Sequence, residues 1–243
     1  MPNIAPKQMM KDRVIVALDV NTLKEEERLL DVLSPEVQIF KIGMELFYSC
    51  GVKSVELVKK YDRDIFLDLK FHDIPNTVYA ASKIAARLGV YMFNVHASGG
   101  IEMMQKAVEG AEEESEKLGM ARPRILGVTV LTSMDSEDLK KTDIHKSPEE
   151  QVLNLARITK EAGLDGVVAS PEEITCIRKA MGKDFLIVTP GVRPEGSKTG
   201  DQKRVATPKE AFQRGADYIV TGRPVTKAKD PVKALKTIAS SFA

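Results

Sequence analysis

The chain alternates short apolar runs with longer amphipathic stretches along almost its whole length. The runs carry many β-branched residues and are apolar on both faces, which is typical of parallel strands covered by helices. Between them, Leu, Ile, Val and Ala recur at helical spacing, for example over Lys24–Leu33, Val52–Tyr61 and Ile101–Leu118. The eight predicted strands are Arg13–Leu18, Gln38–Ile42, Asp64–Leu69, Tyr91–Val95, Arg124–Val130, Gly166–Ala169, Phe185–Val188 and Tyr218–Thr221.

This order favours one fold, a single-domain (β/α)8 TIM barrel of the α/β class that spans residues 1–243. The absence of a linker, a repeat block or a low-complexity tract suits a single barrel of this length. A doubly wound open sheet is the alternative fold. Helices are expected to begin at or just after four prolines, because a proline in the first helical turn loses no helical hydrogen bond. These prolines are Pro148, Pro171, Pro208 and Pro224.

Composition narrows the class of protein. Hydrophobic residues make up 43% of the chain and charged residues 29%, which is ordinary for a soluble globular protein. The net charge of +1 argues against broad binding to nucleic acid or to a membrane surface. Cys50 and Cys176 stand far apart in unrelated contexts, so we interpret them as packing residues in a reducing compartment. With neither a signal-peptide pattern nor a membrane-span pattern, a cytoplasmic location is expected.

Polar residues recur where the predicted strands end. In a TIM barrel, the active site lies at the carboxyl ends of the strands, so these residues are expected to converge on one mouth. Asp19 has a second interpretation as the cap of the next helix. Lys41, in contrast, would be costly to bury in an apolar strand without a partner. In strand order, the residues are Asp19, Lys41, Asp68, Lys70, Asn94, His96, Thr132, Ser133, Ser170, Pro190, Gly222 and Arg223.

The segment Asp68–Thr77 follows an apolar run and brings several charged residues close together in the sequence. Side chains alternate along a strand, so Asp68 and Lys70 are expected to face the same way. Asp73 follows in a turn that Pro75 stiffens. Charged side chains at the end of a buried strand cost free energy to desolvate, and such groups are typical of functional sites. The segment is therefore interpreted as functional rather than as a solvated face.

The last third of the chain predicts an anion site. A stretch without periodicity follows the seventh strand, and its length predicts a lid near residues 190–206. Gly222 and Arg223 follow the eighth strand and open a helix. Phosphate commonly binds at these two loops in TIM barrels. Arg193 and Arg223 would add charge-assisted contacts to such an anion.

Together these motifs resemble the bacterial branch of the orotidine 5'-phosphate decarboxylase family, and the resemblance covers nearly the whole chain. The pattern Asp-x-Lys-x-x-Asp alone is shared by related barrels, but the full ordered set is highly specific. The resemblance implies a metal-free and cofactor-free decarboxylation of orotidine 5'-monophosphate to UMP and CO2 in de novo pyrimidine biosynthesis. The motifs are Ala17-Leu18-Asp19, Phe40-Lys41-Ile42-Gly43, the segment Asp68–Thr77, Leu131-Thr132-Ser133, Thr189-Pro190-Gly191-Val192-Arg193 and Gly222-Arg223-Pro224.

The resemblance also implies a role for each matching residue. Lys70 would stabilise a carbanion at C6 of the pyrimidine and protonate it, with Asp68 near the departing carboxylate. Lys41 and Asp73 would complete a network Lys41–Asp68–Lys70–Asp73, in which Asp73 comes from the partner subunit of a homodimer. The substrate-binding residues would be Asp19, Lys41, Thr77 from the partner subunit, Thr132, Ser133, Pro190, Arg193, Gln202, Gly222 and Arg223.

Three other functions are alternatives. A magnesium-dependent sugar-phosphate decarboxylase or aldolase of the same barrel superfamily has a metal-binding glutamate where this chain has Lys41, a cation that would oppose Mg²⁺ binding. A noncatalytic ligand-binding barrel would not need Lys70 between two acids. A structural or nucleic-acid-binding barrel is disfavoured by the near-neutral charge. His72, His96 and His145 are assigned no role.

Overall fold

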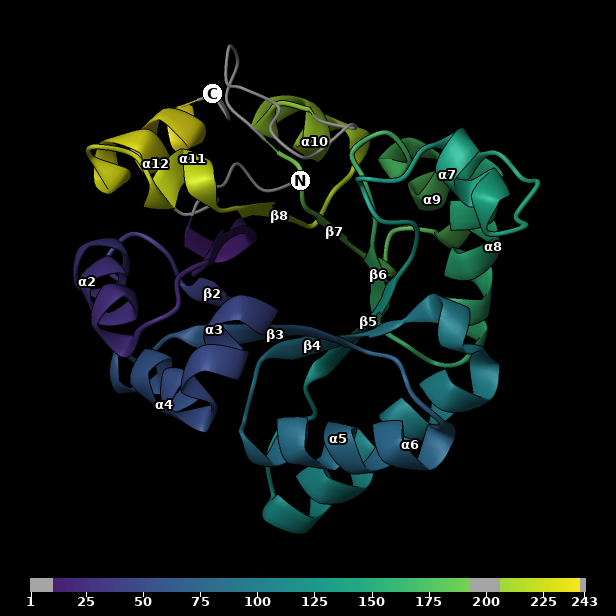
Figure 1. Ribbon diagram of the computed structural model, residues 1–243, viewed down its shortest axis with the longest axis horizontal. Coiled ribbons are helices and arrows are strands. Elements are labelled where there is room, and N and C mark those ends of the chain that lie inside the picture. Colours follow the sequence, from purple (N-terminus) through teal and green to yellow (C-terminus); the bar gives the residue numbers. More distant parts are fainter. Residues whose placement is uncertain (1–10, 193–205, 241–243) are drawn as a thin grey trace.

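The computed structural model describes residues 11–192 and 206–240. Within them, eight parallel strands pair in sequence order and close into a barrel, which the ribbon diagram shows end-on (Figure 1). The predicted single (β/α)8 barrel is therefore confirmed. The strands are β1 (Val14–Ala17), β2 (Ile39–Gly43), β3 (Asp64–Phe71), β4 (Met92–His96), β5 (Arg124–Val128), β6 (Gly166–Val168), β7 (Leu186–Thr189) and β8 (Tyr218–Thr221).

Helices surround the ring of strands on all sides of the view (Figure 1). Several begin at a side-chain cap: Ser147 and Thr207 each accept a hydrogen bond from the backbone three residues later and form a capping box. The helices are α2 (Leu23–Leu33), α3 (Met44–Cys50), α4 (Val52–Lys60), α5 (Pro75–Arg87), the 3₁₀ helix η1 (Ala97–Gly99), α6 (Ile101–Leu118), α7 (Ser136–Lys141), α8 (Pro148–Glu161), α9 (Ile174–Met181), α10 (Pro208–Arg214), α11 (Arg223–Thr226) and α12 (Pro231–Ser240).

The helix starts predicted from the four prolines are confirmed to within a few residues. Helices α8 and α10 start at Pro148 and Pro208, and α11 starts at Arg223, one residue before Pro224. Helix α9 begins at Ile174, because a turn occupies the residues that follow Pro171. Most strand ends lie within one residue of the prediction, but β5 stops two residues early, at Val128, and β3 continues two residues further, to Phe71. The extension of β3 matters for the site.

The core has two layers, and the alternation of strand residues divides them. One face of each strand packs against the helices in a large apolar cluster. The other face points into the barrel, where Ile15, Ile39, Phe66, Met92 and Leu126 form part of a smaller cluster. This filled interior gives any site at the carboxyl ends of the strands a solid apolar floor.

Charged residues tie the amino ends of neighbouring strands together. Asp217, just before β8, accepts hydrogen bonds from the guanidinium of Arg178 at 2.6 Å and from the backbone N–H of Ile187 in β7 at 2.8 Å. Asp165, just before β6, accepts from Arg122 at 2.7 and 3.0 Å and from the backbone N–H of Ile125 in β5 at 2.6 Å. Both carboxylates thus join a guanidinium to the main chain of the adjacent strand.

No helix in the described part of the chain is both long enough and apolar enough to span a membrane.

Candidate active site

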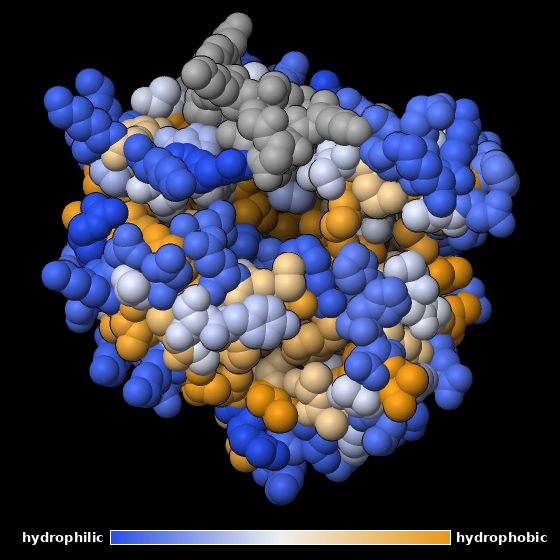
Figure 2. Space-filling model, in the orientation of Figure 1, coloured by the Kyte–Doolittle hydropathy of each residue, from blue (hydrophilic) through white to orange (hydrophobic). Residues whose placement is uncertain are grey.

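A cavity of about 290 Å³ opens at the carboxyl ends of the strands. In the space-filling view, a hollow with hydrophobic residues inside it lies where Figure 1 shows the ring of strands (Figure 2). Apolar side chains including Phe66, Val128 and Val168 line it. The predicted site residues that line it are Asp19, Lys41, Asp68, Lys70, Thr132, Pro190, Gly222 and Arg223.

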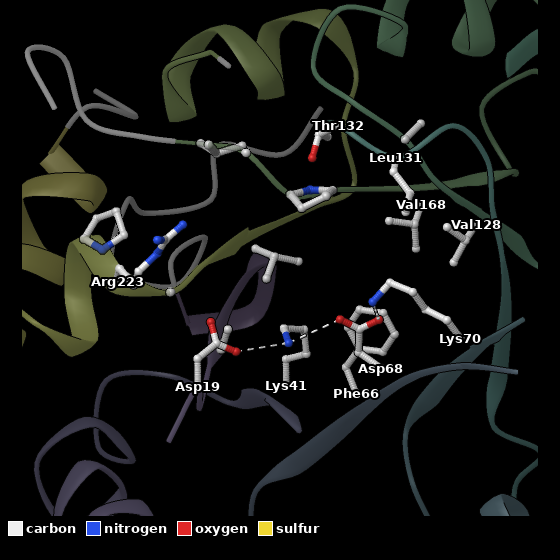
Figure 3. A pocket seen from close by; sticks show the side chains of 18 of the residues that line it. Asp19, Lys41, Phe66, Asp68, Lys70, Val128, Leu131, Thr132, Val168 and Arg223 are labelled. Atoms are coloured by element: carbon white, nitrogen blue, oxygen red, sulfur yellow. Dashed lines mark hydrogen bonds and ion pairs between the residues drawn. The ribbon is translucent and has the colours of Figure 1, made fainter. Parts of the chain in front are cut away.

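Acidic and basic side chains alternate along one side of this cavity (Figure 3). The ammonium of Lys41 lies 3.4 Å from Asp19 Oδ1 and 3.2 Å from Asp68 Oδ2. The ammonium of Lys70 lies 2.7 Å from the other oxygen of Asp68. Only 12% of the Lys41 side chain and 13% of the Asp68 side chain are exposed, so solvent screens this chain of charges weakly.

The acidic and basic side chains of this cluster stabilise each other's ionised forms. Burial is the largest influence on Lys41 and lowers its pKa, but Asp68 and Asp19 outweigh it, so that the pKa lies above its ordinary value. Burial is also the largest influence on Asp68 and raises its pKa. The charges of Lys41 and Lys70, with hydrogen bonds from Lys70 and Asn94, outweigh burial and lower the pKa of Asp68 to about 2. The buried carboxylate is therefore ionised at neutral pH.

An irregular stretch of β3 brings Lys70 to Asp68. The β3–β4 register pairs Leu67 with Phe93 but Phe71 with Val95, so three residues of β3 stand opposite one residue of β4. Lys70 adopts a φ of 52°, which is the left-handed region that a non-glycine residue rarely occupies. The predicted contact between Asp68 and Lys70 is present, but a bulge forms it and not simple strand alternation.

The β4 residue opposite this bulge is Asn94, which the sequence places among the polar residues at the strand ends without a specific role. Its Oδ1 accepts a hydrogen bond from the backbone N–H of Lys70 at 2.8 Å. Its Nδ2 donates to Asp68 Oδ1 at 2.7 Å. The side chain is buried, with 1% of the residue exposed. An amide in the middle of a buried strand was the available signal, but only the register of β3 against β4 gives it partners.

Two glycines leave room for the charged groups. A Cβ on Gly43 would lie 2.8 Å from Lys41 Nζ, and a Cβ on Gly222 would lie 3.0 Å from Asp19 Oδ2. Any side chain at either position would press on the ionic cluster. Gly222 also precedes Arg223, which lies at the opposite end of the cavity from Lys70 in the close-up view (Figure 3).

Other predicted site residues lie apart from this cavity or beyond the description. Asp73, Thr77 and Ser133 are exposed and are not among the residues that line the cavity. Asp73 Oδ1 accepts a hydrogen bond from the backbone N–H of Ile74 at 2.7 Å. Arg193 and Gln202, and most of the predicted lid near residues 190–206, lie outside the described residues. In residues 11–192 and 206–240, no group of three or more His, Cys, Asp or Glu side chains is arranged to hold a metal ion.

The sequence matches the model of the Orotidine 5'-phosphate decarboxylase / HUMPS family over residues 12–238. The chain belongs to this family. A curated relative from Moorella thermoacetica named orotidine 5'-phosphate decarboxylase is 53% identical over 96% of this chain and 92% of its own length. A relative of the same name from Geotalea daltonii is 50% identical, with 95% of both chains covered. The family resemblance and the assignment as an enzyme of the carboxy-lyase class are thus confirmed.

Solved structures agree with the fold. The crystal structure of orotidine 5'-phosphate decarboxylase from Lactobacillus acidophilus superimposes with a TM-score of 0.83 at 41% identity, covering 95% of this chain and 99% of that one. The crystal structure of an uncharacterised conserved protein from Geobacillus kaustophilus gives the same TM-score at 39% identity, covering 95% and 100%. Each likeness extends over the whole barrel and not over an isolated motif.

Proposed function

We propose that this chain converts orotidine 5'-monophosphate to UMP and CO2, with Lys70 as the proton donor. The observation that carries the proposal is the buried array Lys41–Asp68–Lys70 on the wall of the cavity. The names of the relatives at 50% identity and above support the same substrate. By its product, the reaction belongs to pyrimidine biosynthesis.

The chemistry requires stabilisation of negative charge at carbon. The bond between C6 and the carboxylate breaks, CO2 departs, and the electron pair remains on C6, where the ring delocalises it poorly. The Lys70 ammonium then transfers a proton to C6 and regains one from water. An ammonium already fixed by Asp68 at 2.7 Å needs little reorganisation as charge moves from the carboxylate to C6. Its proximity to C6 would also favour the proton transfer.

Asp68 has a second effect in this proposal. Its carboxylate, ionised with a pKa of about 2, would stand near the carboxylate of the bound substrate. Repulsion between the two is relieved when CO2 departs, which is a form of ground-state destabilisation. We give the larger share of the rate to the preorganised field, because Lys41 and Lys70 already balance the charge of Asp68.

The remaining cavity residues would bind the nucleotide. Asp19 and Lys41 are proposed to hold the ribose hydroxyls, and Thr132 with Ser133 and Pro190 the pyrimidine. The 5'-phosphate would bind at the backbone of Gly222 and the guanidinium of Arg223, at the start of α11. Arg193 and Gln202 belong to the predicted lid and stay predictions, as does closure of the lid over the phosphate.

We further propose a homodimer in which Asp73 and Thr77 of one subunit reach the cavity of the other. Both residues are exposed, Asp73 just before α5 and Thr77 in its first turn, and neither lines the cavity of its own subunit. Asp73 would then place a second carboxylate beside Lys70 and complete the network Lys41–Asp68–Lys70–Asp73. A cytoplasmic location also stays a prediction.

The test is turnover of orotidine 5'-monophosphate by the purified protein in EDTA, followed by the loss of orotate absorbance. Conversion to UMP that is unaffected by the chelator is the expected result. No turnover by folded protein in EDTA, followed by turnover of a sugar phosphate when Mg²⁺ is added, would favour the magnesium-dependent alternative. Lys41 argues against that outcome, since its ammonium sits within 4 Å of both Asp19 and Asp68 and would repel a cation there.

A further inference from the structure

We infer that Asn94 is a positioning residue for the decarboxylation: its carboxamide holds the Lys70 backbone and the Asp68 carboxylate in their reactive arrangement. The inference rests on the proposed function. It starts from the register of the barrel, because Asn94 is the one β4 residue between the pairs Leu67–Phe93 and Phe71–Val95. Opposite it, Asp68, Leu69 and Lys70 cannot all pair with β4 in the regular way.

The two bonds of Asn94 replace the ladder hydrogen bonds that the bulge removes. The Lys70 backbone N–H is a donor only, and the ionised Asp68 carboxylate is an acceptor only. A carboxamide is the smallest side chain that offers an acceptor and a donor side by side in a plane. Its Oδ1 therefore faces Lys70 at 2.8 Å and its Nδ2 faces Asp68 at 2.7 Å. Because only 1% of Asn94 is exposed, water does not replace the carboxamide as the partner of Lys70 or of Asp68.

The bond to the main chain of Lys70 offsets a conformational cost. A non-glycine residue at a φ of 52° is strained and persists only when its surroundings fix it. Without the Asn94 acceptor, the part-buried N–H of Lys70 would favour a different backbone conformation in which it has another acceptor. Because the ammonium of Lys70 extends from this backbone, such a change would move the proton donor away from C6.

The bond to Asp68 fixes the second half of the pair. Asp68 Oδ1 accepts from both Lys70 Nζ and Asn94 Nδ2, at 2.7 Å each, so the amide holds the carboxylate oxygen that Lys70 uses. Asn94 does not line the cavity, and we therefore place it behind the reacting groups and not in contact with substrate. Its loss should lower kcat more than the affinity for nucleotide.

Two substitutions separate the two bonds. Asn94→Ala removes both. Asn94→Asp keeps the shape and the acceptor for Lys70, but at high pH it sets a second carboxylate against Asp68. The charged groups around it are Asp68 and Lys70 of β3 and Lys41 of β2, and the titratable groups are His96 of β4 and His72 beside it. The Lys70 N–H and the ammonium groups of Lys41 and Lys70 lower the pKa of the introduced carboxyl, whereas burial and the charge of Asp68, whose Oδ1 lies 2.7 Å from this side chain, raise it. Because Asp68 already engages both ammonium groups, we expect the raising influences to prevail. At low pH its neutral form can donate to Asp68 as the amide does.

We expect Asn94→Ala to lower kcat about 100-fold, the size of effect that a misplacement of about 1 Å produces, and to leave UMP binding within about threefold. The kcat of Asn94→Asp, divided by that of the parent at each pH, should rise about tenfold or more as the pH falls from about 8 to about 5.5. The ratio for Asn94→Ala should stay flat. Thr129→Val is the matched control, because it removes another buried side-chain hydrogen bond at the mouth, the 2.9 Å bond to the carbonyl of Val168, and does not touch the ionic cluster.

Calorimetric titration with UMP counts the folded sites, so kcat is expressed per competent site even in a partly unfolded preparation. A kcat within about threefold of the parent in Asn94→Ala, or a flat pH ratio in Asn94→Asp, overturns the inference. The inference is also overturned if Asn94→Ala loses UMP affinity by the same factor as kcat, because a general distortion of the site would lower both equally. An inactive parent would instead contradict the proposed function.

Discussion

The two ends of the barrel both carry clusters of acidic and basic side chains, but they use the charges differently. At the amino ends, Asp165 and Asp217 each bind a guanidinium and a main-chain N–H of the neighbouring strand. At the carboxyl ends, Asp68 binds two ammonium groups and the amide of Asn94. The first pattern ties the backbone together, whereas the second directs charge into a cavity.

Burial sharpens the difference. Asp68 is 13% exposed, against 28% for Asp217 and 23% for Asp165. A structural ion pair gains little from deeper burial, because desolvation costs grow with it. Deep burial of charge at the mouth, together with a left-handed Lys70, is understandable when the groups are arranged for a substrate and not for stability. Substitutions at the two ends should therefore separate activity from stability.

The largest effect is expected for Lys70→Ala, which removes both the proton donor and the cation nearest the developing charge. The rate per folded site should fall at least about 1,000-fold, while the thermal midpoint changes by only a few degrees. The measurement is UV-monitored turnover together with thermal unfolding.

Lys83→Ala is the matched control for that change. Lys83 forms an ion pair of the same length, 2.7 Å with Glu113, and its side chain is 22% exposed against 25% for Lys70. Nearly normal turnover in Lys70→Ala, or an equal loss in Lys83→Ala, would contradict the assignment of Lys70.

Arg223→Ala tests the phosphate end of the cavity. Loss of a charge-assisted contact should lower kcat/KM for the phosphorylated substrate about 100-fold. Turnover of the truncated nucleoside, which lacks the phosphate, should hardly change. Steady-state assays of both substrates decide the matter, and equal losses on both would mean that Arg223 is structural.

Asp217→Asn tests the amino end. It keeps the shape of the side chain but removes the charge that Arg178 and the Ile187 N–H share, and should lower the free energy of unfolding by about 2 kcal/mol. Activity per folded site should be unchanged. Urea unfolding and UMP-normalised kcat are the measurements. Asp143→Asn, at a side chain that is 95% exposed, should change neither quantity. A loss of kcat in Asp217→Asn would contradict a purely structural role for the charges at the amino ends of the strands.

The smallest effect concerns pH. Asp68 has its pKa lowered to about 2 because Lys41 and Lys70 outweigh its burial, whereas in the unfolded chain an aspartate titrates near about 4. The native state therefore binds fewer protons between these values, and the stabilisation is full above about pH 4 and lost as the pH falls through about 2. It amounts to at most about 2 kcal/mol. In Asp68→Asn, urea unfolding from about pH 5 to pH 2 should show a shallower decline than in the parent. An identical slope would mean that another carboxylate controls acid unfolding.

The sequence by itself determined the barrel and the composition of its mouth. The order of apolar runs and amphipathic stretches is a local property, and eight strands that alternate with helices in a chain of this length favour a closed parallel barrel. Because polar residues such as Asp19, Lys41 and Asp68 lie in or just after the carboxyl-terminal halves of their strands, their convergence follows from the fold alone.

Only the tertiary structure decided how those residues meet. The sequence pattern of β3 indicates regular alternation, but pairing with β4 inserts a bulge and turns Lys70 into the left-handed region. Asn94 finds its two partners through that register, and Asp217 finds Ile187 through the pairing of β7 with β8. These contacts join residues from different strands, and a local pattern carries no information on the register between strands. The chain specifies which groups reach the mouth, and packing between strands specifies the distances at which they act.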